Sequence, residues 1–257
     1  MVLVARSAGV TDVGKVRKHN EDSYLIDDHI GVYIVADGMG GHAGGEVASA
    51  EAIDQIFAMV KNGSTAIDAL RNENSDDNRG ACRRLLEASI QAATYMVFGI
   101  AEQDPARKGM GTTISAMLFV GPIPIVGQVG DSRVYMIRNG VPVQITEDHT
   151  LVNLQIKSGA ITREQARTVP YQNLITRAVG VKDYVEVDTF DVECVVGDRF
   201  VLCSDGVHGY IDTEQQLLPL AQSPTNEGCA RTLVEYAVKR GGRDNATAIC
   251  VDIHQLP

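Results

Sequence analysis

The chain of 257 residues contains no tryptophan, and aromatic residues make up only 5 % of it. It has no Cys-x-x-Cys pair, and its cysteines are odd in number and scattered, at positions 82, 194, 203, 229 and 250. Scattered cysteines, some of them inside apolar runs, predict reduced and buried thiols rather than a disulfide framework. None of the six histidines forms a ligand-spaced pair, so a zinc site is not favoured.

The sequence also has little that would take it to or through a membrane. Residues 1–18 lack the long apolar segment of a secretory signal. An uncharged stretch of membrane-span length, residues 111–130, is broken by two prolines and by glycines inside it. This pattern favours two strands joined by a turn. We therefore predict a cytoplasmic protein that does not engage a membrane.

Positive charge is scarce as well. Lys and Arg total 23 against 33 Asp and Glu, so the formal net charge is −10. A nucleic-acid clamp needs an excess of basic residues, and we therefore expect no nucleic-acid partner. Hydrophobic residues make up 44 % of the chain, which excludes a disordered protein and suffices for a core at this length.

The apolar pattern predicts both helices and strands. Helical periodicity covers the windows 47–60, 85–100 and 229–238. Strands are predicted at 32–36, 113–120, 123–129, 133–138, 185–192, 200–203 and 246–251, with a two-residue hairpin turn at Asn139-Gly140. Residues 72–80 (NENSDDNRG) have the composition of an exposed loop. Because the strands cluster instead of alternating with helices, we expect an α+β fold of antiparallel sheets with helices outside.

Acidic residues recur at the ends of the predicted strands, and three of the six stand directly beside a glycine. They are Glu21, Asp22, Asp37, Asp131, Asp205 and Asp244. Any single Asp-Gly pair is most often a simple turn, and the recurrence is what calls for an explanation. A carboxylate at a buried strand end is costly unless it is paired or binds a metal, and basic residues are scarce nearby. Several carboxylates together suit a hard cation such as Mg²⁺ or Mn²⁺.

Other phosphate-handling motifs are incomplete. Residues 9–15 resemble a P-loop, but Val16 stands where a hydroxyl residue would bind Mg²⁺. Residues 38–43 follow a strand as a dinucleotide-binding loop would, which leaves that function open, although Asp37 would face the pyrophosphate. Cys194 lacks an arginine at the spacing of a thiolate phosphatase. Water activated by a metal is the best remaining nucleophile.

Seven short motifs follow one another along nearly the whole chain. They are G-x-x-R-K-x-N-E-D (14–22), V-A-D-G-M-G-G-H-A-G-G (35–45), M-G-T-T (110–113), V-G-D-S-R-V-Y (129–135), D-H-T (148–150), L-C-S-D-G (202–206) and G-G-R-D-N-A-T (241–247). Together they resemble the PPM family, the metal-dependent serine/threonine protein phosphatases of type 2C, and in particular its bacterial branch. The resemblance implies one domain over residues 1–257. It also implies a four-layer α-β-β-α sandwich of two antiparallel sheets flanked by helices, with a flap-like insertion at about 155–177.

The resemblance also implies a set of metal ligands: Asp37, Gly38, Asp205, Asp244, Asp131, Glu21 and Asp22. Asp37 would bridge two Mn²⁺ or Mg²⁺ ions, and Gly38 would offer its carbonyl. Glu21 and Asp22 would act largely through water on the metal. In bacterial members, the aspartates that match Asp131 and Asp205 hold a third, looser metal.

The resemblance assigns phosphate binding to Arg17, whose planar guanidinium suits a bidentate clamp. Eukaryotic members have a histidine directly after Asp-Gly, where this chain has Met39. His42 is the best local candidate for the general acid, with a backbone-bonding loop histidine as the alternative. His208 lies near the predicted metals, but the family pattern gives it no role. The flap is locally basic, which could attract a phosphopeptide.

We therefore predict a protein serine/threonine phosphatase that hydrolyses phosphoserine and phosphothreonine with metal-activated water and opposes a eukaryotic-like kinase. Its expected partners are phosphorylated proteins and a cognate kinase, and we expect a monomer. Two alternatives stay open. One is a phosphatase-like binding module without turnover, and the other is a phosphatase specialised for one phosphoserine regulator of transcription.

Overall fold

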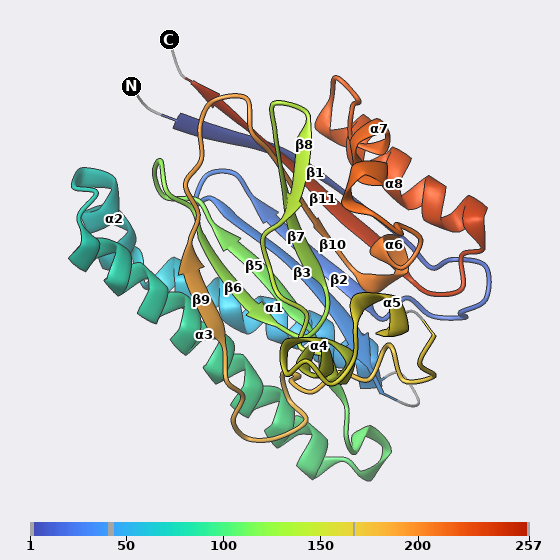
Figure 1. Ribbon diagram of the computed structural model, residues 1–257. Helices are drawn as coiled ribbons and strands as arrows, with labels where there is room; N and C mark the ends of the chain where they lie inside the picture. Colours follow the sequence, from blue (N-terminus) through green and yellow to red (C-terminus); the bar gives the residue numbers. More distant parts are fainter. Residues whose placement is uncertain (1–2, 41–43, 167, 256–257) are drawn as a thin grey trace.

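The computed structural model describes residues 3–40, 44–166 and 168–255, and it is a sandwich of two antiparallel sheets (Figure 1). The first sheet has the order β1 (Leu3–Asp12), β11 (Ala246–Gln255), β10 (Arg199–Cys203), β7 (Arg133–Arg138) and β8 (Val141–Gln144). The second has the order β2 (Asp22–Asp27), β3 (Val32–Met39), β5 (Ile114–Leu118), β6 (Ile125–Val129) and β9 (Asp188–Asp191), with β4 (Gly111–Thr112) paired to the end of β3.

Helices cover the outer face of each sheet, so the predicted four-layer α-β-β-α architecture is confirmed (Figure 1). The second sheet is covered by α1 (Gly44–Asn62) and α3 (Asp76–Gln103), with α2 (Ser64–Asn72) packed against α3. The first sheet is covered by α6 (Asp205–His208), α7 (Leu217–Leu220) and α8 (Asn226–Arg240). Two short helices, α4 (Leu151–Lys157) and α5 (Arg163–Ala166), and the 3-10 turns η1 (Pro105–Arg107) and η2 (Glu214–Gln216) complete the described elements.

Three apolar layers hold the sandwich together. On β3, Tyr33 packs between the sheets while its neighbour Ile34 packs under the helices. On β10, Leu202 packs between the sheets while Val201 faces α8. Successive side chains of a strand point to opposite faces, so a strand with apolar layers on both sides reads as an unbroken apolar run. This explains the runs that predicted these strands.

The predicted helices and strands are all present, with shifted ends. Asn139 (φ 52°) and Gly140 (φ 77°) form the tight turn of the β7–β8 hairpin, as predicted. The first sheet contains one strand that was not predicted, β1, which pairs with β11 along its whole length. β1 is an edge strand with partly exposed side chains, and it therefore lacks the apolar run of the central strands.

The predicted loop at 72–80 is wrong for its second half, because α3 begins at Asp76. Ser75 is the N-cap: its hydroxyl accepts a hydrogen bond from the Asn78 N–H at 3.3 Å. Asp76 and Asp77 occupy the first turn, where carboxylates favour the positive end of a helix. The polar residues that suggested a loop are a helix start.

The expectation of five reduced thiols is also wrong, because Cys229 of α8 and Cys250 of β11 form a disulfide. Both side chains lie in the same apolar layer, where α8 packs on the first sheet and brings residues distant in sequence together. Cys82, Cys194 and Cys203 are free and buried, as predicted. Within residues 3–40, 44–166 and 168–255, no helix has the length and apolarity needed to span a bilayer.

Candidate functional site

The strand register brings the acidic residues to one edge of the sandwich. In the second sheet, Asp22 at the start of β2 pairs directly with Asp37 near the end of β3. In the first sheet, Cys203 at the end of β10 pairs with Arg133 at the start of β7 and with Ala248 near the start of β11. Asp131, Asp205 and Asp244 lie just outside these strand ends. Antiparallel pairing therefore gathers carboxylates that are far apart in the sequence.

These carboxylates repel one another in a partly desolvated place. Burial raises the pKa of Asp22 to about 7 and that of Asp131 to about 7, with the Asp205 carboxylate adding to both. Burial also raises the pKa of Asp37 well above its usual range, and Asp22, Asp205 and Asp131 contribute. The pKa of Asp205 is raised by burial and by Asp244. Such a group of like charges favours either protons or a bound cation.

Asp22 shows how the site holds one of these carboxylates. Its Oδ2 accepts hydrogen bonds from the hydroxyls of Thr247 at 2.6 Å and Ser204 at 2.8 Å. Its Oδ1 is buried and has no hydrogen-bond partner in the described part of the chain. An orphaned buried carboxylate oxygen is unusual, and together with an oxygen-only donor set it fits a hard divalent cation. Among the described residues, however, no three His, Cys, Asp or Glu side chains already close around one point.

Arg17 lies at this edge and reaches across to Asp244. Its Nη2 donates to Asp244 Oδ2 at 2.6 Å, and half of the Arg17 side chain is exposed. Asp244 holds the guanidinium at the acidic edge while leaving donors free toward solvent. The predicted phosphate-binding residue is thus next to the predicted metal ligands.

Glu21 and Gly38 pack against the start of α1. The Glu21 carboxylate accepts a hydrogen bond from the Gly45 N–H, where the helix end favours negative charge. The backbone of Gly38 donates to the Glu21 carbonyl at 3.1 Å. A Cβ on Gly38 would collide with the carbonyls of Glu21 and Gly45. This close packing is a reason for glycine that the sequence did not show.

Two predicted residues need separate mention. His42, the predicted general acid, lies outside the described residues. His208 is buried, and its Nε2 lies 2.9 Å from the Asp131 carbonyl. Burial lowers the pKa of His208 to about 3.

Three polar residues that support the site were not singled out from the sequence: Ser204, Asn245 and Thr247. Asn245 is buried and joins three parts of the chain. Its Oδ1 accepts from the Glu21 N–H at 2.8 Å, and its Nδ2 donates to the carbonyls of Val13 and His19 at 2.9 Å each. It therefore positions the segment that carries Arg17 and Glu21. The signal for Ser204 and Asn245 was their place directly beside Asp205 and Asp244, and Thr247 ends the same motif as Asp244.

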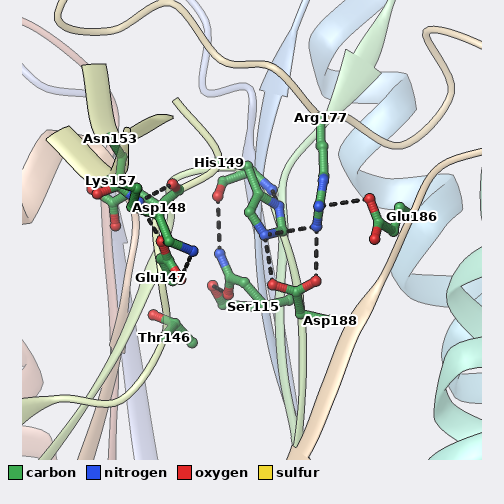
Figure 2. Close-up of polar contacts among 12 residues, drawn as sticks. Ser115, Thr146, Glu147, Asp148, His149, Asn153, Lys157, Arg177, Glu186 and Asp188 are labelled. Carbon is green, nitrogen blue, oxygen red and sulfur yellow. Dashed lines mark hydrogen bonds and ion pairs between the residues drawn. The ribbon is translucent and has the colours of Figure 1, made fainter. Parts of the chain in front are cut away.

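A second polar cluster lies beside the Asp131 turn (Figure 2). His149 Nε2 is 3.0 Å from Asp188 Oδ2, and Arg177 donates to Asp188 at 2.7 Å and to Glu186 at 2.6 Å. Lys157 of α4 pairs with Glu147 in the same view. A cavity of about 270 Å³ lies among these side chains. Lys157 and Arg177, two basic residues of the predicted flap, are therefore paired with acidic residues outside that segment.

Comparison with known proteins identifies the family of this chain. The family model for "Protein phosphatase 2C" matches residues 15–236. The chain is 36 % identical over 253 residues to the serine/threonine protein phosphatase PstP of Mycobacterium tuberculosis, covering 98 % of this chain and 46 % of PstP. It is 35 % identical over 245 residues to the serine/threonine phosphatase stp of Listeria innocua, covering 94 % of this chain and 93 % of stp.

Solved structures give the same result. The chain superposes on M. tuberculosis PstP with a TM-score of 0.86 at 35 % identity, covering 98 % of this chain and 100 % of the other. The PstP catalytic domain in complex with two manganese ions gives a TM-score of 0.83 at 35 % identity, with the same coverage. The chain spans about half the length of full PstP, 46 %. This chain belongs to the protein phosphatase 2C family of metal-dependent serine/threonine protein phosphatases, in its bacterial branch.

Proposed function

We propose that the acidic edge binds Mn²⁺ or Mg²⁺ and that this chain hydrolyses phosphoserine and phosphothreonine in proteins. The observation that carries the proposal is the gathering of Asp22, Asp37, Asp131, Asp205 and Asp244 at one edge, each of the first four with a raised pKa. The proposed ligands are these residues with Glu21 and the Gly38 carbonyl. Asp37 would serve two ions, and Asp131 with Asp205 a third.

Bound divalent cations would neutralise the carboxylates and lower the pKa of a water molecule so that it can attack phosphorus. The residues around them have separable tasks. Ser204 and Thr247 fix the orientation of Asp22, because both hydroxyls bond the same oxygen. Arg17, held by Asp244, would bind two oxygens of the substrate phosphoryl group.

The leaving serine or threonine oxygen needs a proton, and we assign this to His42. The other histidine near the site, His208, is a poor alternative, which supports this choice. The residue is 8 % exposed, and its Nε2–H donates to a main-chain carbonyl. A low pKa of about 3 keeps it neutral at physiological pH, so it would have no proton to spare without breaking that bond.

The remaining proposals concern the protein as a whole. We infer one domain over residues 1–257, with the segment 155–177 acting as a flap. The packing of both sheets into one sandwich over the described residues supports a single domain. The named relatives are serine/threonine phosphatases, which supports phosphorylated proteins as the substrates of this chain. We further propose that a cognate kinase phosphorylates these substrates, and that the chain acts in the cytoplasm as a monomer.

Turnover with metal tests the proposal directly. Purified chain with Mn²⁺ should hydrolyse phosphothreonine peptides and an aryl phosphate, and EDTA should stop both reactions. Asp244→Asn should abolish turnover, whereas Asp54→Asn, on the exposed face of α1, should leave it unchanged. Mn²⁺ binding without turnover on either substrate would instead identify the phosphatase-like binding module. No metal binding would refute the site.

A further inference from the structure

The turn between β6 and β7, which carries Asp131, is held by polar side chains from other parts of the chain. Gln128 Nε2 donates to the Gly130 carbonyl at 3.1 Å, and His149 Nδ1 accepts the Gly130 N–H at 3.1 Å. The Asp131 carbonyl accepts a hydrogen bond from His208 Nε2 at 2.9 Å. The turn is therefore supported from three sides, which places its carboxylate on a rigid base.

His208 comes from the element that carries Asp205. It is the last residue of α6, and Asp205 is the first, three positions earlier. Residues three positions apart are neighbours on a helix surface. A carbonyl oxygen can only accept, so the Nε2 atom carries the proton of this bond. His208 as a whole is only 8 % exposed, and water cannot easily replace it as the partner of the carbonyl.

This hydrogen bond joins the two elements that carry Asp131 and Asp205. Cys203 at the end of β10 pairs with Arg133 at the start of β7, and Asp205 and Asp131 each lie two residues beyond this pair, so both stand at the same end of the sheet. Asp131 lies on the β6–β7 turn and Asp205 on α6. In the described chain, the hydrogen bond from His208 to the Asp131 carbonyl joins these two supports directly.

We propose that His208 is a positioning residue that sets the separation of the Asp131 and Asp205 carboxylates and thereby the affinity of this edge for its weaker-binding metal ion. The role rests on the proposed function, since it has meaning only if these carboxylates bind a cation. Without the Nε2–H donor, the direct hydrogen bond between α6 and the turn would be lost, and the turn would keep only its bonds to Gln128 and His149. The Asp131 carbonyl would also be left buried and unpaired.

Three variants separate the hydrogen bond from the bulk of the ring. His208→Gln keeps an N–H donor near the position of Nε2. The side chain of His208→Asn is too short for its N–H donor to reach the Asp131 carbonyl, and His208→Leu has no donor. If the leucine variant fails to fold, the glutamine–asparagine pair still carries the test. Ile56→Val, in the core of α1, controls for a general loss of stability.

The measurement is calorimetric Mn²⁺ binding to the metal-free full chain, which does not depend on turnover. We expect His208→Asn to weaken the weaker class of Mn²⁺ sites by roughly 10–100-fold, the effect of losing a residue that supports a ligand. The tighter class should keep its affinity, and His208→Gln should recover most of the loss. In an Asp131→Asn background, His208→Asn should add little, because the ligand it positions is gone.

Several results would overturn this role. One is a wild-type isotherm with only a single class of sites, and another is unchanged weak-site affinity in His208→Asn. Equal weakening of both classes, or a glutamine variant no better than asparagine, would show a structural role only. The proposed function is judged separately. Tight Mn²⁺ binding with turnover in the wild type would sustain it even if His208 proves irrelevant.

Discussion

At the scale of single residues, the acidic side chains of the site have few positively charged partners. Asp22 faces Asp37 across two strands, and like charges directly opposite each other destabilise a sheet. The hydroxyls of Ser204 and Thr247 orient Asp22 but add no charge. Arg17 is the positive side chain bonded to Asp244, and it is half exposed. The metal-free site is therefore strained electrostatically.

Replacing one of these carboxylates should separate stability from activity. We expect Asp37→Asn to abolish Mn²⁺-dependent turnover and to raise the melting temperature in EDTA at pH 8. The gain should be about 2–4 °C, which corresponds to about 1 kcal/mol in a domain of this size. The reason is that the amide replaces a carboxyl group whose pKa is raised by burial and by neighbouring aspartates, so an unfavourable negative charge is removed. Calorimetry and a phosphatase assay on the same preparation check both parts. A lower melting temperature would contradict the electrostatic account.

At the scale of elements, short segments and their ends decide where the candidate site residues lie. α6 has only four residues, and it carries Asp205 at one end and His208 at the other. α3 is long, yet its start depends on one side chain, Ser75, that caps it within a polar segment. The α3 start lies away from the acidic edge, on the outer face of the second sheet.

Removal of this cap should cost stability without affecting the site. Ser75→Ala should lower the free energy of unfolding by about 1 kcal/mol, because the Asn78 N–H loses its acceptor. Ser75→Asp, which keeps an acceptor, should restore it. Chemical denaturation measures the change, and kcat/KM should stay at the wild-type value in both variants. An equal loss in the aspartate variant would rule out capping as the cause.

At the scale of the whole molecule, the raised pKa values of the acidic edge link the stability of the fold to pH. The folded-state pKa values of Asp22 and Asp131 are about 7, against about 4 in an unfolded chain. Between these values the folded protein binds more protons, so this stability is complete below about pH 4 and is lost as the pH rises through 7. His208, with a pKa of about 3, acts in the opposite sense, but only below about pH 6.5.

The window from pH 6 to pH 8 therefore reports mainly on the carboxylates. In EDTA, we expect a lower melting temperature at pH 8 than at pH 6. Mn²⁺ should raise it more at pH 8, because ionised carboxylates bind the cation without first losing protons. Differential scanning fluorimetry measures both effects, and Asp131→Asn should reduce the pH dependence. A melting temperature in EDTA that does not change between pH 6 and pH 8 would contradict the linkage.

Much of this could be predicted from the sequence because the signals are local. Apolar runs such as 32–36 show strands buried on both faces, and Asn139-Gly140 shows a hairpin through its left-handed backbone. The acidic residues predicted at strand ends do gather at one edge of the sandwich. The start of α3, the edge strand β1 and the Cys229–Cys250 disulfide were missed or mistaken. Each depends on a cap or on partners that local composition does not show.

The sequence by itself determined the chemical types at the site and the order of its motifs, because carboxylates, glycines and Arg17 carry their chemistry wherever the chain places them. Only the tertiary structure decided which residues form hydrogen bonds with them. It brought Ser204 and Thr247 onto one oxygen of Asp22, Asn245 across to the Glu21 segment, and His208 onto the Asp131 carbonyl. These contacts join residues far apart in the chain, and they exist only because antiparallel register places the strand ends of two sheets at one edge.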